Sequence, residues 1–516
     1  MPSKRTFARR FGAVAAGALA LVTAMGAVAV METPAAAASP RAAENKIILT
    51  ARQDPGTLDY VKSNLTALRL WIPANVVEPL VYFNKDGSVS PGVAEKWDIS
   101  DDKLTYTFHI RAAKFSDGSP ITADDVVYSL ETMSKSPVVD TAAAFLQVAS
   151  IDKVDDHTVK VTLKQPSQGF WHGMGALSGL VQPKAAAGSI ATNPIGSGPY
   201  KVAEYVSNSD LRFTINPNYW GPKPAITDVT VRIITDGTAG LNALEAGEVD
   251  ASPVNTIDLW DQLTKRGLDK KFALVTFPQA GEPTYAIVNT KIPLPERQAI
   301  AETLDRQAFN DAFGAPWGAE NTCTFALPNQ SWYRPASDAS TCPYPYNLDK
   351  ATKDVAAGGF GSQQLNYASL SDVPDLSLPA DIMIPEMQAA GFNVNRNAMD
   401  LARYAQLIFQ GKPPQFDVTI MSGDANPAQW ACTDPSKAGW STYCSTDYTN
   451  ALAEADKALT QADYDASMLK AADILRKDAV LIPLLAKKGV GLWDPALKGF
   501  IEPRVAVALE FAPLHW

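Results

Sequence analysis

The sequence predicts a mixed α/β fold divided over two or three domains. At 516 residues the chain is too long to fold around one hydrophobic core. Leu104–Ile110 and His157–Leu163 alternate apolar and polar residues, which is typical of strands with one buried face. Glu296–Phe313 instead repeats its apolar residues on one side of a helix. Both kinds of segment recur along the chain, and together they favour a mixed fold.

Residues 1–38 predict an export signal peptide that is not part of the fold. Four basic residues precede Phe11–Val30, an apolar stretch rich in Ala and Val, and small residues follow at Pro34–Ala38. The alternative is an uncleaved membrane anchor, which the alanine-rich tail disfavours. Arg9 and Arg10 leave twin-arginine export open beside the general secretory route. No cysteine lies near the cleavage region, so we expect a periplasmic or extracellular protein that is not a lipoprotein.

The charge of the chain argues against nucleic acid and anionic lipid as partners. The sequence holds 45 Lys and Arg against 55 Asp and Glu, which gives a formal net charge of −10 at pH 7. Removal of the basic leader would make the mature protein more acidic still. Binding to nucleic acid or to anionic membranes needs basic patches. We therefore expect neither partner.

The four cysteines form two pairs that are local in sequence, Cys323/Cys342 and Cys432/Cys444. In an oxidising compartment this pairing closes two short loops, each worth about 3 kcal/mol on the chain-entropy relation. A metal site is the alternative, but neither pair has CxxC spacing and no histidine lies nearby. The sequence therefore predicts two disulfides and no metal.

The pattern of apolar residues and turn residues predicts further elements along the chain. Besides the segments above, strands are expected at Lys46–Thr50, Val229–Ile234, Phe416–Met421 and Leu481–Leu485, and helices at Gly240–Gly247, Pro385–Ala390, Leu401–Phe409, Tyr448–Leu459 and Tyr464–Asp478. Thr66–Val81 is expected to be a mostly buried helical stretch that Pro73 interrupts and Pro79 ends. Thr122 is expected to cap a helix that follows it, with acidic residues in its first turn.

Asn193–Gly221 predicts a β-hairpin between two rigid turns. Gly196, Gly198 and Pro199 form an opening turn that no helix interior would tolerate. Two alternating runs follow, Tyr200–Val206 and Leu211–Ile215, separated by a short polar segment. Alternation on both sides of such a segment is typical of a hairpin with one buried face.

The motifs of common enzyme classes are missing. The sequence contains no HExxH, GxSxG, P-loop or GxGxxG pattern. Of the four histidines, His109 and His157 fall in predicted strands and His515 in the tail, and only His172 lies in a Gly-rich loop where it could reach a ligand. None has the spacing of a metal site. We predict no enzyme, no cofactor and no metal.

One carboxylate stands apart as a candidate ligand contact. Asp424 follows the apolar run Val418–Met421 and precedes Asn426 and Pro427, which places it in a turn after a buried strand. It is either a turn-forming residue or a carboxylate that holds a ligand's ammonium group in a dry cleft. Seven tryptophans could line such a cleft or belong to the core. They are Trp71, Trp171, Trp220, Trp317, Trp332, Trp430 and Trp440.

Several short stretches carry a resemblance to a known family. They are Pro91–Trp97, Tyr106–Arg111, Phe115–Gly118, Thr122–Leu130, Gly196–Tyr200, Asn216–Gly221 and Ala246–Asp250. Together they resemble the peptide/nickel-type (family 5) extracellular solute-binding proteins of ABC importers, which include dipeptide- and oligopeptide-binding proteins. The similarity is strong through residue 250 and looser after it, where Arg297–Ile300 and Ala479–Leu484 also fit.

The resemblance implies a two-lobed clamp, the type II class C fold of periplasmic binding proteins, with an extra subdomain. Lobe one would be discontinuous and would carry the subdomain as an insertion, and lobe two would be one continuous segment. The implied boundaries are 45–85, 190–283 and 485–516 for lobe one, 86–189 for the subdomain, and 284–484 for lobe two.

The resemblance also implies a site between the lobes. In dipeptide binders an aspartate of lobe two pairs with the ligand's α-ammonium, and Ser422-Gly423-Asp424 resembles that site. The match departs from the family because the stretch before the acid is about two residues short and Asn426 replaces an aspartate. Cys432 and Cys444 fall where dipeptide binders also carry a cysteine pair. Further candidate contacts are Met421, Asn64, Leu65, Tyr285 and Asn289.

The function implied is capture of a peptide or other amine-bearing solute for an ABC importer. The partners would be the ligand and the membrane permease subunits, and the protein would act as a monomer. With His172 the only loop histidine inside the fold, direct nickel binding is not expected. The alternatives are a secreted sensor or envelope-assembly protein with the same fold, and an exported hydrolase with paired carboxylates. Which solute is bound stays open, since one fold serves many ligands.

Overall fold

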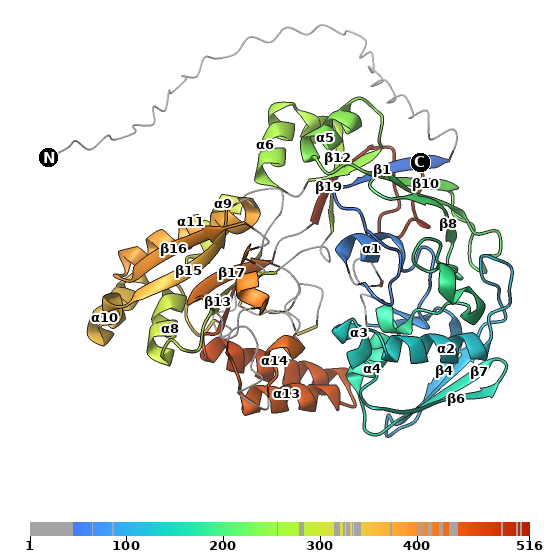
Figure 1. Ribbon diagram of the computed structural model, residues 1–516, viewed down its shortest axis with the longest axis horizontal. Coiled ribbons are helices and arrows are strands. Elements are labelled where there is room, and N and C mark those ends of the chain that lie inside the picture. The colour runs from blue at the N-terminus through green and yellow to red at the C-terminus, as the bar shows by residue number, and fades with distance from the viewer. Residues whose placement is uncertain are drawn as a thin grey trace, which may run out of the picture. The chain divides into compact units, whose positions relative to one another are not determined.

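The computed structural model divides the chain into two units, Met1–Ala38 and Ser39–Trp516, and every element below belongs to the second. Four β-sheets organise this unit (Figure 1). The structure describes residues 45–516 except 64, 85–86, 255, 278–282, 314–319, 324–325, 327–330, 333, 335–341, 372–373, 401–402, 405, 411–414, 423–426, 433–441, 487–488, 502–503 and 506–507.

A seven-stranded sheet has the order β12-β19-β11-β1-β10-β9-β8. The central strand β1 (Lys46–Ala51) pairs in parallel with β10 (Asp228–Ile233) and β11 (Ala251–Pro253), and the other neighbours are antiparallel. The remaining strands are β8 (Tyr200–Val206), β9 (Asp210–Ile215), β12 (Ala273–Phe277) and β19 (Gly489–Trp493). The helices α5 (Gly237–Glu245), α6 (Ile257–Lys265) and α7 (Leu268–Lys271) share a hydrophobic cluster with β19.

A four-stranded antiparallel sheet has the order β4-β5-β7-β6. One buried cluster contains Phe108 and Leu130 from this region together with Phe213 and Val231 from the seven-stranded sheet, so the two sheets share a core. The elements here are β2 (Val81–Phe83), β3 (Val89–Pro91), β4 (Ala94–Ile99), β5 (Thr105–Ile110), β6 (Val148–Asp155), β7 (Thr158–Leu163), α1 (Thr66–Trp71), α2 (Ala123–Ser134), α3 (Val139–Ala143) and α4 (Gln168–Gly173).

A six-stranded sheet has the order β14-β18-β13-β17-β15-β16. Its central strand β13 (Pro283–Val288) is buried on both faces: Ala286 and Val288 belong to one hydrophobic cluster, and Tyr285 and Ile287 belong to another. Helices α8 to α11 contribute to the first cluster, and α13 and α14 to the second. The strands are β14 (Glu320–Asn321), β15 (Gln364–Leu370), β16 (Asn393–Met399), β17 (Val418–Ser422) and β18 (Leu481–Ala486), and the helices α8 (Leu294–Glu302), α9 (Arg306–Phe313), α10 (Leu348–Gly358), α11 (Pro374–Ala389), α13 (Thr446–Asp456) and α14 (Gln461–Lys477).

Two connections join the seven-stranded and six-stranded sheets, from β12 to β13 and from β18 to β19. The two connections run beside each other, because the strands they link are paired within each sheet. In the seven-stranded sheet β12 pairs with β19, with Phe277 opposite Gly489. In the six-stranded sheet β13 pairs with β18, with Pro283 opposite Ala486. The domain boundaries expected from the sequence stay a prediction, because sheet membership assigns strands and does not define where a domain ends.

The predicted hairpin is confirmed as β8 and β9, and its opening turn packs against an earlier segment of the chain. A side chain at Gly196 would place its Cβ 2.1 Å from the carbonyl oxygen of Val76, and one at Gly198 would place it 2.5 Å from that of Asn75. Asn216 Nδ2 donates to the Gly198 carbonyl at 2.8 Å from the far end of the hairpin. Glycine is therefore needed here for close backbone packing.

Glu78 is a buried carboxylate that fastens this motif to the core. Its Oε2 accepts hydrogen bonds from Ser197 Oγ and Trp220 Nε1, both at 2.8 Å, and its Oε1 accepts one from Tyr82 Oη at 3.1 Å. Burial raises the pKa of Glu78 above its ordinary value, and these three hydrogen bonds oppose that shift. The Arg111 guanidinium stacks 3.5 Å above the Trp220 ring centre.

Three helix predictions are wrong in extent. The short helix expected over Pro385–Ala390 is only the last part of α11, which begins at Pro374 and ends at Ala389. The single helix expected over Glu296–Phe313 is two helices, α8 and α9, because the Asp305 carboxylate accepts hydrogen bonds from the backbone N–H groups of Gln307 and Ala308 and so caps a new helix. The helical stretch expected over Thr66–Val81 does stop just before Pro73, as predicted, because α1 ends at Trp71, but no helix follows between Pro73 and Pro79. The helix expected over Leu401–Phe409 lies partly outside the described residues, because 401, 402 and 405 are not among them. The described residues Gln406–Gln410 form a π-helical turn.

Both predicted disulfides are confirmed. Cys323 is bonded to Cys342 with their Cα atoms 5.3 Å apart, and Cys432 is bonded to Cys444 with their Cα atoms 4.9 Å apart. Both bridges belong to the part of the chain that carries the six-stranded sheet.

Candidate functional site

The ends of β17 and β13 define the place where ligand contacts are expected. Ser422, the last residue of β17, pairs with Thr284, and the neighbouring Pro283 pairs with Ala486 at the end of β18. This edge of the six-stranded sheet is therefore the edge from which the chain crosses to the seven-stranded sheet. Strand β17 therefore ends at the edge where the two sheets join, and ligand sites are common at such junctions.

The structure brings two of the predicted contacts together. Tyr285 and Met421 are register partners on β13 and β17. Tyr285 is buried, and Met421 is partly buried against the same cluster. Gly423 and Asp424, which carry the proposed ammonium contact, lie outside the described residues, as does Asn64.

The other two predicted contacts lie in different surroundings. Asn289 is fully buried at the opposite end of β13, where its Nδ2 donates to the Phe416 carbonyl and its Oδ1 accepts from Thr442 Oγ1 at 2.9 Å and from Lys291 N at 3.0 Å. These bonds give Asn289 a structural role in holding the strand ends. Leu65 is 45% exposed immediately before α1, an unusual place for a large apolar side chain.

A second contact between distant parts of the chain joins α4 to α13. The carboxylate of Asp456, the last residue of α13, accepts hydrogen bonds from Ser167 Oγ and from Gly169 N, both at 2.8 Å. Ser167 is the N-cap of α4, so Asp456 supplies a negative charge to the N-terminus of that helix. Gln168 Nε2 also donates to the Ala458 carbonyl at 2.6 Å.

His172 extends the same contact. The structure corrects its expected loop setting, because His172 lies in the last turn of α4. Its ring packs edge-on against Tyr464 of α14 at 5.4 Å and against Phe83 at 5.2 Å. Burial lowers the pKa of His172 below its ordinary value, and the charges of Asp456 and Asp465 oppose that shift. The neutral ring is therefore favoured while α4 and α14 stay in contact.

Sequence reasoning missed the Asp456 contact because its two sides are 289 residues apart. Ser167 and Asp456 each look like ordinary helix-end residues, and no local pattern shows that one helix end serves the other. A covariation signal between these positions is the kind of observation that could find such a pair.

No group of His, Cys, Asp or Glu among the described residues has the arrangement of a metal site. Within those same residues, none of the helices has the length and apolar character needed to cross a bilayer.

The structure has two sheets joined by paired crossing strands, and a third sheet shares the core of one of them. This architecture matches the class C fold of periplasmic binding proteins. Residues 88–430 match the family described as bacterial extracellular solute-binding proteins, family 5 (middle region), and the chain belongs to this family. It is accordingly a solute-binding protein of the kind that serves ABC import, and a binding protein rather than an enzyme.

The relatives agree with this assignment. The chain is 27% identical over 484 residues to the periplasmic oligopeptide-binding protein OppA of Salmonella typhimurium, covering 83% of this chain and 85% of OppA. Its fold matches the substrate-binding protein CtaP of Listeria monocytogenes with a TM-score of 0.78 at 24% identity, over 91% of this chain and 99% of CtaP. It also matches DppA of Helicobacter pylori, solved with the peptide STSA, with a TM-score of 0.74 at 21% identity, over 91% of this chain and 98% of DppA.

Proposed function

We propose that this protein captures a peptide, or another solute with a free amine, and delivers it to the permease subunits of an ABC importer. The observation that carries the proposal is the similarity to an oligopeptide-binding protein along most of both chains. We further propose that the protein is exported to the periplasm or the cell exterior. There it would carry no lipid anchor and would act as a monomer. The periplasmic naming of relatives supports the first of these.

The proposed site lies between the parts that carry the seven-stranded and six-stranded sheets. Paired strands at both crossings are suited to act as a hinge, since the chain can bend there without breaking either sheet. Asp424 would meet the ligand's ammonium group from the loop after β17, and Gly423 and Met421 would shape the same wall. Tyr285 lies beside Met421 and would support it from β13.

Calorimetry with a small set of peptides tests this function. We expect the protein, freed of any solute that co-purifies, to bind dipeptides or oligopeptides and to bind their N-acetylated forms far more weakly. Native mass spectrometry of the protein purified from its own organism should show a bound solute with a primary amine. If the co-purified solute had no amine, or if peptides of every length gave no heat of binding, the proposal would be wrong.

The contact between α4 and α13 is proposed to favour the closed arrangement. Replacing Asp456 with alanine removes the acceptor of two hydrogen bonds, and we expect ligand affinity to fall about tenfold, because each bond contributes about 1 kcal/mol or less at a partly exposed position. Affinity by calorimetry and radius of gyration by X-ray scattering measure the effect.

Glu454→Ala is the matched control for Asp456→Ala. Glu454 lies on the same helix, but its carboxylate pairs with Lys470 of α14 at 2.7 Å and does not reach α4. The control should keep wild-type affinity and compactness. Equal affinity and equal radius of gyration for Asp456→Ala and wild type would show that the contact does not influence closure.

A further inference from the structure

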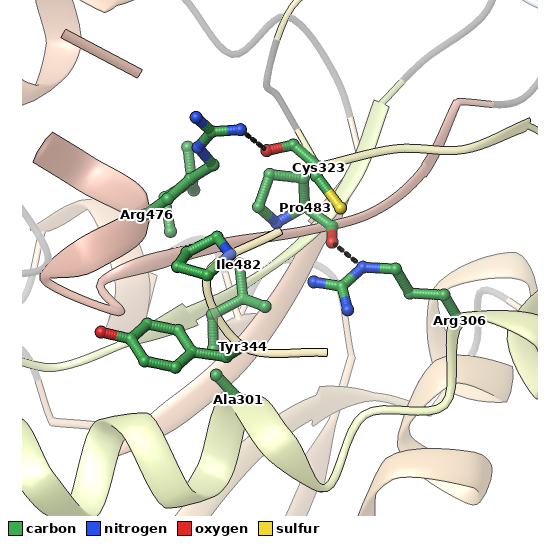
Figure 2. A pocket seen from close by; sticks show the side chains of 9 residues that line it. Ala301, Arg306, Cys323, Tyr344, Arg476, Ile482 and Pro483 are labelled. Carbon is green, nitrogen blue, oxygen red and sulfur yellow. Dashed lines mark hydrogen bonds between the residues drawn. The ribbon is translucent and has the colours of Figure 1, made fainter. Parts of the chain in front are cut away.

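The ionisable groups around α14 differ in whether hydrogen bonds hold them. Beside the small cavity in Figure 2, Arg306 Nε donates to the Pro483 carbonyl at 2.9 Å, and Arg476 Nη1 donates to the Cys323 carbonyl at 3.0 Å. These bonds tie α9 and α14 to neighbouring backbone and give both arginines a structural role. His172 is different, because its ring makes no hydrogen bond and no ion pair with any described residue.

The ring of His172 lies between aromatic side chains from two distant parts of the chain. It packs edge-on against Tyr464 of α14, with ring centres 5.4 Å apart, and against Phe83 of β2, with ring centres 5.2 Å apart. The Tyr464 hydroxyl stays protonated at neutral pH, because burial raises its pKa to about 12. A neutral imidazole suits such a place, whereas the imidazolium carries a charge and two N–H groups that both need acceptors. Protonation therefore costs hydration free energy that the aromatic neighbours return only in part.

Two carboxylates face this ring, and both already accept other hydrogen bonds. Asp456 of α13 accepts the two bonds from the start of α4. Asp465 of α14 accepts from Ser331 Oγ at 2.6 Å and from Gln461 Nε2 at 2.9 Å. The helix α4 and the strand β2 contribute no charged side chain besides His172 itself. The two carboxylates favour the protonated ring through space but form no ion pair with it, and burial has the larger effect, so the pKa of His172 is lowered.

The charge of His172 is linked to whether α4 and α14 touch. Phe170 of α4 belongs to the core that the seven-stranded and four-stranded sheets share, whereas α14 packs on the six-stranded sheet. When these two parts separate, water reaches the ring, and its pKa returns toward the ordinary value of about 6.5. Above that pH the ring is neutral in both arrangements. Below it, uptake of a proton favours the separated arrangement.

We propose that His172 is a pH switch: in mild acid its ring takes up a proton, α4 is released from α14, and the hold on the bound solute weakens. This inference rests on the proposed function, because a solute enclosed between the two parts escapes when they separate. The protein holds its solute most tightly at neutral pH, whichever solute it carries.

Calorimetry at pH 7.5 and pH 5.5, with the alanine di-, tri- and tetrapeptides as probes, tests the switch. His172→Phe keeps an aromatic ring between Phe83 and Tyr464 and cannot titrate, so it shares every other effect of pH, including ionisation of the peptide amine. Relative to this variant, we expect the wild type to lose affinity about fivefold between pH 7.5 and pH 5.5. His109→Gln is the matched control, because His109 pairs with Asp98 at 2.9 Å on the four-stranded sheet, and it should keep the wild-type loss.

A proton NMR titration of the wild type gives a measurement that needs neither a peptide nor a folded variant. We expect the His172 ring to titrate with a midpoint below 6.5, and lower still when a peptide is bound. A midpoint at or above 6.5 would overturn the inference, as would an equal loss of affinity in acid for wild type and His172→Phe. If none of the three peptides bound at pH 7.5, the proposed function would be in question instead, and the NMR midpoint would still decide whether the contact disfavours a protonated His172.

Discussion

Replacing Asp424 with alanine is expected to lower the affinity for a free-amine peptide by about 100-fold or more. The proposed contact joins a carboxylate to the ligand's ammonium group in a site that closes around the ligand. Loss of one partner leaves the other charge buried without compensation, which typically costs about 3–5 kcal/mol. Titration calorimetry of the variant with a dipeptide measures the loss directly.

An N-acetylated peptide and a surface variant separate this contact from general damage. The wild type should bind the acetylated peptide about as weakly as Asp424→Ala binds the free one, and the variant should barely distinguish the two peptides. Asp311→Ala, an exposed carboxylate on α9, should bind like the wild type. If Asp424→Ala kept full affinity with an unchanged Tm, another residue would have to hold the ammonium group.

Replacing Glu78 with alanine is expected to destabilise the protein by about 3–5 kcal/mol. The change leaves the Tyr82 hydroxyl, the Ser197 hydroxyl and the Trp220 indole N–H without their acceptor inside the core. It also removes the carboxylate that ties the Gly196–Gly198 turn to the preceding segment. Urea unfolding, followed by tryptophan fluorescence, would report the change as a lower midpoint.

Glu78→Gln is the matched control, and it gives a pH dependence with a defined sign. Glutamine keeps an acceptor oxygen and carries no charge, so it should cost much less than alanine. Because the pKa of Glu78 is raised in the folded state, the folded protein holds a proton there at pH values where the unfolded chain has lost it. Relative to Glu78→Gln, the wild type should therefore gain stability as the pH falls from 7 toward 4.5. If the difference in unfolding free energy between wild type and Glu78→Gln stayed constant, or shrank, as the pH fell over that range, the raised pKa of Glu78 would be contradicted.

The fold could be predicted best where local chemistry and tertiary packing agree. The β8–β9 hairpin was expected from alternation between turn residues, and the structure has it at nearly the same bounds. Thr122 was expected to cap a helix, and the structure adds the reason: the Asp125 carboxylate accepts from both Thr122 N and Thr122 Oγ1. In each case the residues that give the signal also make the bonds.

The fold could not be predicted as well where a local pattern is ambiguous. Ile300, Leu304 and Phe309 keep helical spacing across the break between α8 and α9, and all three are fully buried, so periodicity alone joins the two helices. The signal that could have separated them is Asp305, a good N-cap directly before Arg306.

Only part of the candidate site could be predicted from the sequence. The apolar run before Asp424 correctly predicted a buried strand, which is β17. Asn289 is a candidate because it lies at the start of the expected lobe two, but only the fold shows that its amide donates to the Phe416 carbonyl and accepts from Thr442. The contact made by Asp456 could not be predicted, because its partners belong to a helix that is distant in the chain.

The paired crossings between β12 and β13 and between β18 and β19 also bear on how such a chain could have arisen. Entry to the six-stranded sheet and exit from it lie side by side, since Pro283 and Ala486 are partners, as are Phe277 and Gly489 just before and after. A short turn from 277 to 489 would therefore close the seven-stranded sheet as an ordinary hairpin. Adjacent ends are the condition under which a whole block can be inserted into, or exchanged between, genes without disturbing its host. The residues between the two crossings form a block with ends of this kind.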